Sequence, residues 1–183
     1  MVWNKELKRE IPEGWKVKYI ADLTGISNDS INPMKEPEKE FKHYSIPVFD
    51  ETGTYNIEKG KEIRSNKFVV DKLDLLVSKL NPSFNRVIYS TEESDLICST
   101  EFVVWRTSNT SIKNYLYMVA KDPSFISFCI NSSSGTSHSH SSINPSVMIK
   151  FKLPYYNKIA ELFGSKIESS IKMYAKNQVE NQQ

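Results

Sequence analysis

The sequence predicts an α+β fold: a mixed or antiparallel, β-rich domain with a few helices, followed by a C-terminal α-helix. Short runs of β-branched and aromatic residues gather between positions 74 and 107, which is typical of strands. After Asn109 the apolar spacing becomes helical. From Asn157 onward, apolar residues recur every three or four positions, which indicates a final amphipathic helix.

The strands are expected in short segments along the first two thirds of the chain. Trp15, Val17 and Tyr19 alternate with lysines, a period that favours a strand. Apolar or β-branched runs predict further strands over residues 41–50, 67–70, 74–80, 86–90, 96–107 and 147–154.

Three connections separate these strands. Residues 28–40 contain two prolines and many charges and are expected to form an exposed loop. Glycines punctuate the segment 53–60, and an Asn-Pro turn with a second asparagine at its end occupies residues 81–85.

Helices are predicted where the 3–4 spacing appears. Residues 114–120 have apolar side chains on one face, and Asp122 with Pro123 form a typical helix start for residues 122–130. In the C-terminal helix, Ile159, Leu162, Phe163, Lys166, Ile167 and Ile171 follow 3–4 spacing and leave a narrow apolar stripe.

The common catalytic motifs are missing. The chain has no G-x-G-x-x-G, G-x-x-x-x-G-K-[ST], G-x-S-x-G or H-E-x-x-H sequence. The tetrapeptides at 81–84 and 144–147 share only the Asn-Pro start with the Asn-Pro-Pro-Tyr type of motif that amino-methyltransferases use. These absences disfavour catalysis. A nuclease or methyltransferase with an unrecognised site stays an alternative, as does a protein-interaction module built on the terminal helix.

A metal site is also disfavoured. His138 and His140 could share a metal ion with His43 or a cysteine. However, two histidines two positions apart in a serine-rich tract have no fixed geometry, and no third ligand has a typical spacing. Cys98 and Cys129 are too few for a disulfide framework, so buried free thiols are expected.

The compartment is predicted from what the sequence lacks. No apolar run reaches membrane-spanning length, and the first fifteen residues have no signal-peptide pattern. We therefore expect a soluble, cytoplasmic protein without a membrane partner.

The basic residues point to nucleic acid. The net charge is only +2, so phosphate contacts would require local positive charge or help from other subunits. Residues 59–86 hold seven basic and three acidic side chains. Lysine and arginine meet phosphates, whereas arginine, asparagine and hydroxyl groups contact base edges. For residues 78–86, within this segment, a solvated hairpin tip is the alternative interpretation.

An ordered series of motifs covers the chain from about Ile11 to Lys172. It consists of "IPEGWKVKYIADL", "HYSIPVFDETGTYNIEKGKEIRSNKFVV", "VSKLNPSFNRVIY", "ICSTEFVVWRT", "SGTSHSHSSINPSVMIKFKLP" and "KIAELFGSKIESSIK". Together these motifs resemble the specificity (S, HsdS) subunits of type I restriction–modification systems. The resemblance implies a lead-in over residues 1–10, a target recognition domain (TRD) over 11–154, and the start of a conserved spacer helix over 155–183.

The resemblance also implies the function and the partners. The chain would be a non-catalytic subunit that recognises one half of a bipartite double-stranded DNA target and directs the methyltransferase (M) and restriction (R) subunits. It would bind no cofactor itself, because S-adenosylmethionine, ATP and Mg²⁺ belong to the partner subunits. By the same resemblance the DNA-facing residues are Lys79, Asn81, Asn85, Arg86, Thr136, Ser137, His138, Ser139 and His140, followed by Arg64, Asn66 and Lys67.

The sequence departs from the family by holding one TRD and one partial helix. An excised or truncated half, a natural half-subunit that dimerises, and a fragment of a longer gene remain open as explanations. The apolar stripe of the terminal helix favours a homodimer through that helix.

Overall fold

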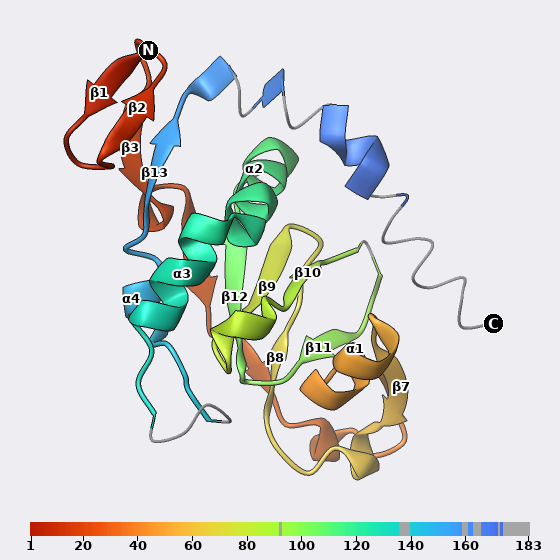
Figure 1. Ribbon diagram of the computed structural model, residues 1–183. Helices are drawn as coiled ribbons and strands as arrows, with labels where there is room; N and C mark the ends of the chain where they lie inside the picture. Colours follow the sequence, from red (N-terminus) through yellow and green to blue (C-terminus); the bar gives the residue numbers. More distant parts are fainter. Residues whose placement is uncertain (92, 136–139, 159–160, 163–165, 172, 174–183) are drawn as a thin grey trace.

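Two β-sheets, packed against each other and against two helices, form the body of the protein. The computed structural model describes residues 1–91, 93–135, 140–158, 161–162, 166–171 and 173. Within these residues the elements follow the mixed, largely antiparallel β-rich arrangement predicted from the sequence, so the α+β fold class is confirmed (Figure 1).

The first sheet is antiparallel and lies at the centre of the molecule. Its strands run in the order β10 (Val87–Tyr89), β9 (Asp74–Ser78), β12 (Phe102–Thr107) and β4 (Thr24–Ser27). All five residues of β9 are buried, which fits a strand covered on both faces and explains its continuous apolar run.

The second sheet is mixed. Its order is β5 (Ser30–Ile31), β8 (Lys67–Val69), β11 (Leu96–Cys98), β6 (Glu40–Tyr44) and β7 (Asn56–Lys59). Only the β11–β6 pair is parallel, and the other pairs are antiparallel.

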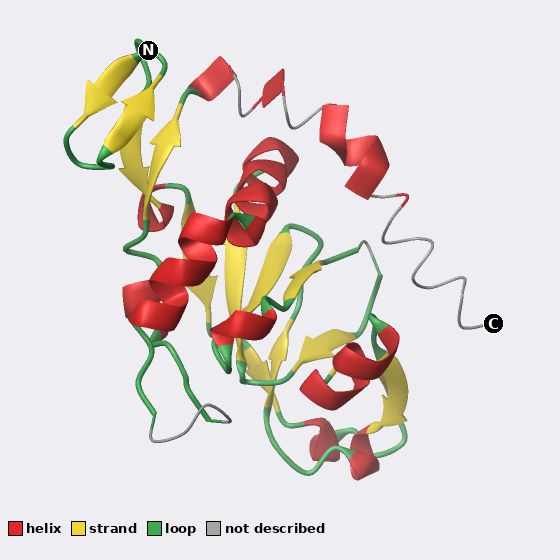
Figure 2. Cartoon of the chain, viewed as in Figure 1, coloured by secondary structure: helices red, strands yellow, loops and turns green. Residues whose placement is uncertain are grey.

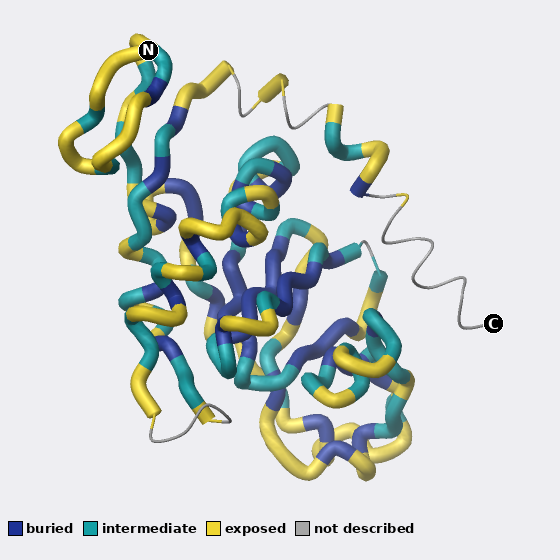
Figure 3. Tube along the Cα trace, viewed as in Figure 1, coloured by how far each residue is buried: buried dark blue, intermediate teal, exposed yellow. Residues whose placement is uncertain are grey.

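The core has three layers because β9 alternates its side chains between two neighbours. Leu75 and Val77 join a cluster with residues of α2 (Thr110–Lys121) and α3 (Pro123–Asn131). Leu76 instead joins a cluster with residues of the second sheet, such as Leu96. Figure 3 shows the central strands as the most buried part of the chain. This core fixes the strand ends from which the candidate loops leave.

Helices α2 and α3 begin at side-chain caps. The Asn109 side chain accepts a hydrogen bond from the Ile112 backbone N–H, and Asp122 accepts one from Ser124 N–H. Pro123 occupies the first turn of α3, as predicted.

Two small sheets complete the chain. β1 (Val2–Asn4) and β2 (Arg9–Ile11) form a hairpin, a structure that the short, charged N-terminal sequence did not predict. β13 (Lys152–Tyr155) pairs antiparallel with β3 (Lys16–Tyr19). Helical backbone follows at 157–158, 161–162 and 166–171; Ile159 and Phe163 of the predicted stripe lie outside the described residues.

Two strand predictions were partly wrong. The second half of segment 41–50 belongs to helix α1 (Ile46–Thr52), because Ser45 caps it and Pro47 occupies its first turn (Figure 2). Segment 147–154 begins in the short helix α4 (Pro145–Met148), where Asn144 is the cap. Strand periodicity alone did not distinguish these capped turns from β structure.

Two other boundaries also differ from prediction. The glycine-punctuated segment 53–60 contains strand β7, which pairs with β6. Segment 96–107 is two strands, β11 and β12, in different sheets. A turn at 99–101 carries the chain from one sheet to the other, and both strands look alike in sequence because both are buried.

The described helices include none that is long and apolar enough to cross a membrane. Cys98 and Cys129 are free and buried, as predicted. Burial raises the pKa of the Cys129 thiol to about 12, which makes this thiol a poor nucleophile.

Candidate nucleic-acid interface

The Asn-Pro segment after β9 forms a rigid turn. Pro82–Phe84 is a short 3-10 helix, η4, and the residues on either side, Asn81 and Asn85, are left-handed with φ of 47° and 45°. Asparagine tolerates this conformation better than most residues. Pro82 is buried, and the Asn85 side-chain amide donates to the Ala120 carbonyl at the end of α2, 2.8 Å away. The turn is thus fixed to the body of the protein.

The backbone joins this turn to the serine-rich loop. Asn81 N–H donates to the Ser141 carbonyl at 2.8 Å, and Ile143 N–H donates to the Lys79 carbonyl at 3.1 Å. The Ser141 hydroxyl also lies 3.4 Å from Asn81 Oδ1. The two candidate polar segments, 79–86 and 132–142, are therefore joined where residues 79–81 meet residues 141–143. We name the two segments the loop pair.

The serine-rich loop is closed at its base by its own backbone. Ser134 and Ser142 exchange two backbone hydrogen bonds of 3.0 Å. A Cβ atom on Gly135 would lie 2.7 Å from the His140 carbonyl oxygen, so only glycine fits there without a shift of the backbone. The loop is thus anchored inside the domain, unlike a linker between domains.

Four predicted residues of this loop, Thr136, Ser137, His138 and Ser139, lie outside the described residues. His140 is described and is exposed. In the described part of the chain, no three His, Cys, Asp or Glu side chains gather in a group that could hold a metal ion.

Arg86 has a partner that the sequence did not reveal. Its Nε and one terminal nitrogen donate to the two carboxylate oxygens of Asp50 in α1, at 2.6 and 2.7 Å. The other terminal nitrogen donates to the Leu80 carbonyl at 3.3 Å. With its side chain only 7% exposed, Arg86 holds the turn in place and has little surface left for DNA. No sequence signal pointed to Asp50, which is 36 positions away.

Arg64, Asn66 and Lys67 belong to a different part of the molecule. They lie where the chain leaves η3 (Gly60–Glu62) and enters β8. Arg64 and Asn66 are exposed, whereas Lys67 is buried and its ammonium group donates to the Ser65 hydroxyl at 2.5 Å. Burial lowers the pKa of Lys67, although Glu58 acts in the opposite direction.

Phe84 is a surface residue whose sequence context is an incomplete match to the Asn-Pro-Pro-Tyr type of motif. Its side chain is 66% exposed although it sits at the tip of a rigid turn. The Arg86 guanidinium carbon lies 4.6 Å from the centre of the Phe84 ring, so the cation covers one face of the ring. An aromatic residue following Asn-Pro-Ser in a turn was the only available signal.

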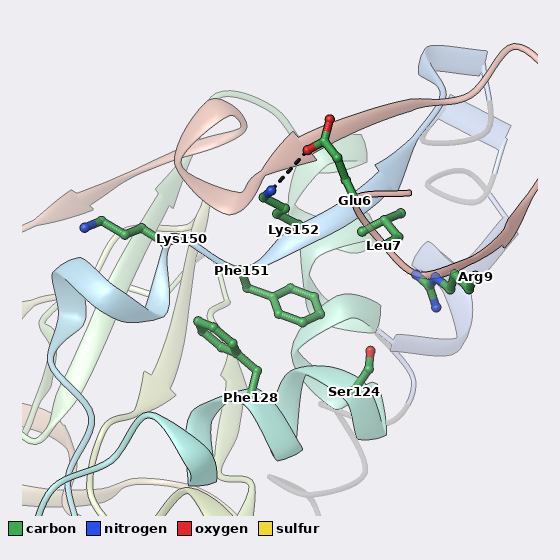
Figure 4. Close-up of a pocket in the computed structure, with 8 residues that line it drawn as sticks. All are labelled: Glu6, Leu7, Arg9, Ser124, Phe128, Lys150, Phe151 and Lys152. Carbon is green, nitrogen blue, oxygen red and sulfur yellow. Dashed lines mark hydrogen bonds and ion pairs between the residues drawn. The ribbon is translucent and has the colours of Figure 1, made fainter. Parts of the chain in front are cut away.

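A pocket lies elsewhere, between the N-terminal hairpin and the body of the protein (Figure 4). Its volume is about 370 Å³. Within it the Lys152 ammonium contacts Glu6 Oε2 at 3.1 Å, and the rings of Phe128 and Phe151 are 5.4 Å apart. The ion pair attaches the hairpin to β13, and the ring contact joins α3 to the residue just before β13. These contacts give the pocket a structural explanation.

A comparison with protein families decides the affiliation of the chain. The model of the type I restriction modification DNA specificity domain matches residues 12–173. The chain belongs to this family. Members of this family are DNA specificity domains and not catalytic subunits, which agrees with the missing catalytic motifs. A search of curated proteins finds no match to this chain.

Solved structures share the fold of this specificity-domain chain. A structure described with complex assembly and conformational transition of the type I R-M system contains a chain that is 18% identical, with a TM-score of 0.72 over 94% of this chain. The HsdS subunit from Thermoanaerobacter tengcongensis is 18% identical, with a TM-score of 0.71 over 93%. The S subunit from M. genitalium is 13% identical, with a TM-score of 0.57 over 88%.

These matches cover less than half of the solved chains. This chain spans 45% of each of the first two chains and 40% of the third. It therefore corresponds to somewhat less than half of each of those solved chains.

Proposed function

We propose that this chain recognises one part of a bipartite double-stranded DNA target, as the specificity component of a type I restriction–modification system. The observation that carries the proposal is the loop pair: backbone hydrogen bonds join two polar segments, remote in sequence, at one anchored surface. Membership of the DNA specificity domain family supports the same function.

Within the loop pair we assign different tasks to different residues. Lys79 supplies charge for a phosphate, and Asn81 and the exposed His140 supply groups that hydrogen-bond to phosphates or base edges. Thr136, Ser137, His138 and Ser139 extend this set in the proposal. Asn85 and Arg86 instead position the turn, because their side chains are bonded to Ala120 and Asp50. Exposed Arg64 and Asn66 form a second tier, and buried Lys67 supports them.

The proposed partners are the methyltransferase and restriction subunits, in the cytoplasm. S-adenosylmethionine, ATP and Mg²⁺ would bind to those subunits, and this chain would direct them to their site. A net charge of +2 is compatible with this arrangement, because partner subunits can supply further phosphate contacts.

A homodimer through the C-terminal helix is a further part of the proposal. Of the predicted stripe, Leu162 is 57% exposed, whereas Ile171 is only 7% exposed. Met173, outside the stripe, is 63% exposed, and exposed apolar residues on a helix favour association. Light scattering over a range of concentrations tests this association. A dimer at high concentration agrees with it, and a strict monomer at every concentration contradicts it.

Selection from a random duplex pool tests the main proposal. The chain is mixed with the methyltransferase subunit and the pool, and the retained duplexes are sequenced. Enrichment of one short half-site supports sequence recognition. Retention without any enrichment contradicts it and would instead favour a protein-interaction module.

A further inference from the structure

The exposed ring of Phe84 calls for an explanation because the turn that carries it is rigid. A phenyl ring that is 66% exposed leaves apolar surface in water, which is unfavourable unless a partner covers it. Proteins tolerate single exposed apolar residues, but this one sits at the tip of a turn anchored at both ends. The anchors are two hydrogen bonds: Asn81 N–H donates to the Ser141 carbonyl, and the Asn85 side-chain amide donates to the Ala120 carbonyl.

One face of the ring is covered by a charged side chain. Arg86 is held by two bonds to the Asp50 carboxylate, and its guanidinium group lies 4.6 Å from the centre of the ring. Two bonds in a planar fork leave the guanidinium little freedom to rotate. The cation therefore supports one face of Phe84 and leaves its other face and its edge for a partner.

We propose that Phe84 contacts the 5-methyl group of a thymine in the DNA half-site and so makes the loop pair selective for thymine at one position. This inference rests on the proposed function and adds a base-specific contact to it. Phenylalanine and other apolar groups contact the thymine methyl group in the major groove. Lys79 and Asn81 of the same turn supply the neighbouring polar contacts.

The covered face of the ring favours this contact over insertion between base pairs. A ring inserted fully between two base pairs would be stacked on both of its faces, and such insertion also costs partial unstacking of the base step. Arg86 occupies one face of Phe84, whereas a methyl group needs only one. The geometry therefore points to contact with a base substituent and not to a wedge.

A chemical double-mutant cycle tests the inference with the chain and the methyltransferase subunit together. The half-site enriched by the wild-type chain is synthesised with each thymine replaced in turn by uracil, which lacks the methyl group. Wild type should lose about threefold to fivefold in affinity at one position, the amount expected for one buried methyl group. Phe84→Ala should lose about fivefold to tenfold on the thymine site and be insensitive to uracil at that position.

Two further variants sharpen the result. Phe84→Leu keeps an apolar side chain and should retain part of the discrimination. Trp3→Ala removes another exposed aromatic side chain, 64% exposed in the N-terminal hairpin, and should retain the full wild-type response.

The outcomes separate the inference from the proposed function. If wild type enriches a half-site but uracil and Phe84→Ala reduce the affinity additively, the thymine contact is wrong and the proposed function stands. An enriched half-site that contains no thymine leads to the same conclusion. Absence of any enrichment by wild type overturns the proposed function, and the contact with it. The contact is supported if Phe84→Ala no longer loses affinity when thymine is replaced by uracil, while wild type and Trp3→Ala still do.

Discussion

The carboxylate of Asp50 and the guanidinium group of Arg86 form a bidentate pair, with N–O distances of 2.6 and 2.7 Å. The pair joins helix α1 to the turn that carries Asn81 and Phe84, across 36 positions of sequence. By the resemblance to S subunits, Arg86 was expected to face DNA. Its geometry makes it a support for the side chains beside it.

Removing either partner of this pair should loosen the turn. Asp50→Ala leaves a buried guanidinium without its carboxylate, and Asp50 is half-exposed, so the expected loss of unfolding free energy is about 1–2 kcal/mol. Urea unfolding measures this value. Glu51→Ala, on the exposed surface of the same helix, is the matched control and should change stability by less than about 0.5 kcal/mol.

The same pair predicts how DNA binding responds. Arg86→Ala and Asp50→Ala should weaken binding to a similar degree, and the double variant should be no weaker than either single one, because both act through the position of the turn. Binding isotherms with the methyltransferase subunit present provide the test. If Arg86→Ala alone relaxed the specificity at one base position, Arg86 would itself contact that base.

At position 85, asparagine should give a more stable protein than either alanine or glycine. Alanine loses the 2.8 Å bond to the Ala120 carbonyl and strains the left-handed backbone, whereas glycine loses only the bond and chain entropy. We expect about 2 kcal/mol of destabilisation for Asn85→Ala and about 1 kcal/mol for Asn85→Gly. Thermal or urea unfolding distinguishes them, and equal losses would argue against backbone strain at this position.

His43 should make the stability of the fold depend on pH. Burial lowers the pKa of His43 below its usual 6.5, and this effect outweighs the opposing contribution of Glu58, whose carboxylate lies 2.5 Å from Nδ1. Nε2 is buried with no hydrogen-bond partner among the described residues, so a proton there would lack an acceptor.

The direction of this pH dependence follows from proton binding by the folded and unfolded chains. Near and below pH 6.5 the unfolded chain takes up the proton that folded His43 resists, so stability is highest above pH 6.5 and falls as the pH drops. Urea unfolding at pH 7.5 and 5.5 should show this fall in wild type and a smaller one in His43→Gln. Glu58→Gln should steepen it, because the pKa of His43 then drops further. An identical pH dependence in wild type and His43→Gln would contradict this assignment.

Lys79 should act on all DNA sequences alike. If its ammonium group contacts a phosphate, Lys79→Ala weakens binding uniformly and reduces the slope of log affinity against log salt by about 1. Titrations of specific and random duplexes at several salt concentrations measure both effects. Lys5→Ala, in the exposed part of the N-terminal hairpin, is the control and should leave the slope unchanged.

Much of the fold could be predicted from local signals. β9, β12 and the capped start of α3 follow from apolar runs and from Asp122 with Pro123. The fold class followed from the strand-like and helical apolar patterns, and the family followed from the ordered motifs. The helical state of residues 46–52 and the separation of β11 from β12 were missed, because one depends on the cap at Ser45 and the other on long-range strand pairing.

The candidate site was predictable in part. Two polar segments could be identified by their residue types. No local sequence pattern predicted the hydrogen bond between the Asn81 and Ser141 backbones. Nor could sequence show that Arg86 is paired with Asp50 while Phe84 is exposed. These relationships depend on tertiary packing between residues that are distant in sequence.

The most direct test of the loop pair as the recognition surface compares enriched half-sites. Wild type, the double variant Asn81→Gly with His140→Ala, and the control Lys5→Ala are each taken through the random-pool selection with the methyltransferase subunit. Glycine at position 81 keeps the left-handed backbone and the Asn81 N–H bond to the Ser141 carbonyl, and it removes the side chain with its 3.4 Å contact to the Ser141 hydroxyl. We expect wild type and Lys5→Ala to enrich the same half-site, and the double variant to lose preference at one or more positions. An unchanged half-site, enriched equally well by the double variant, would contradict recognition through the loop pair.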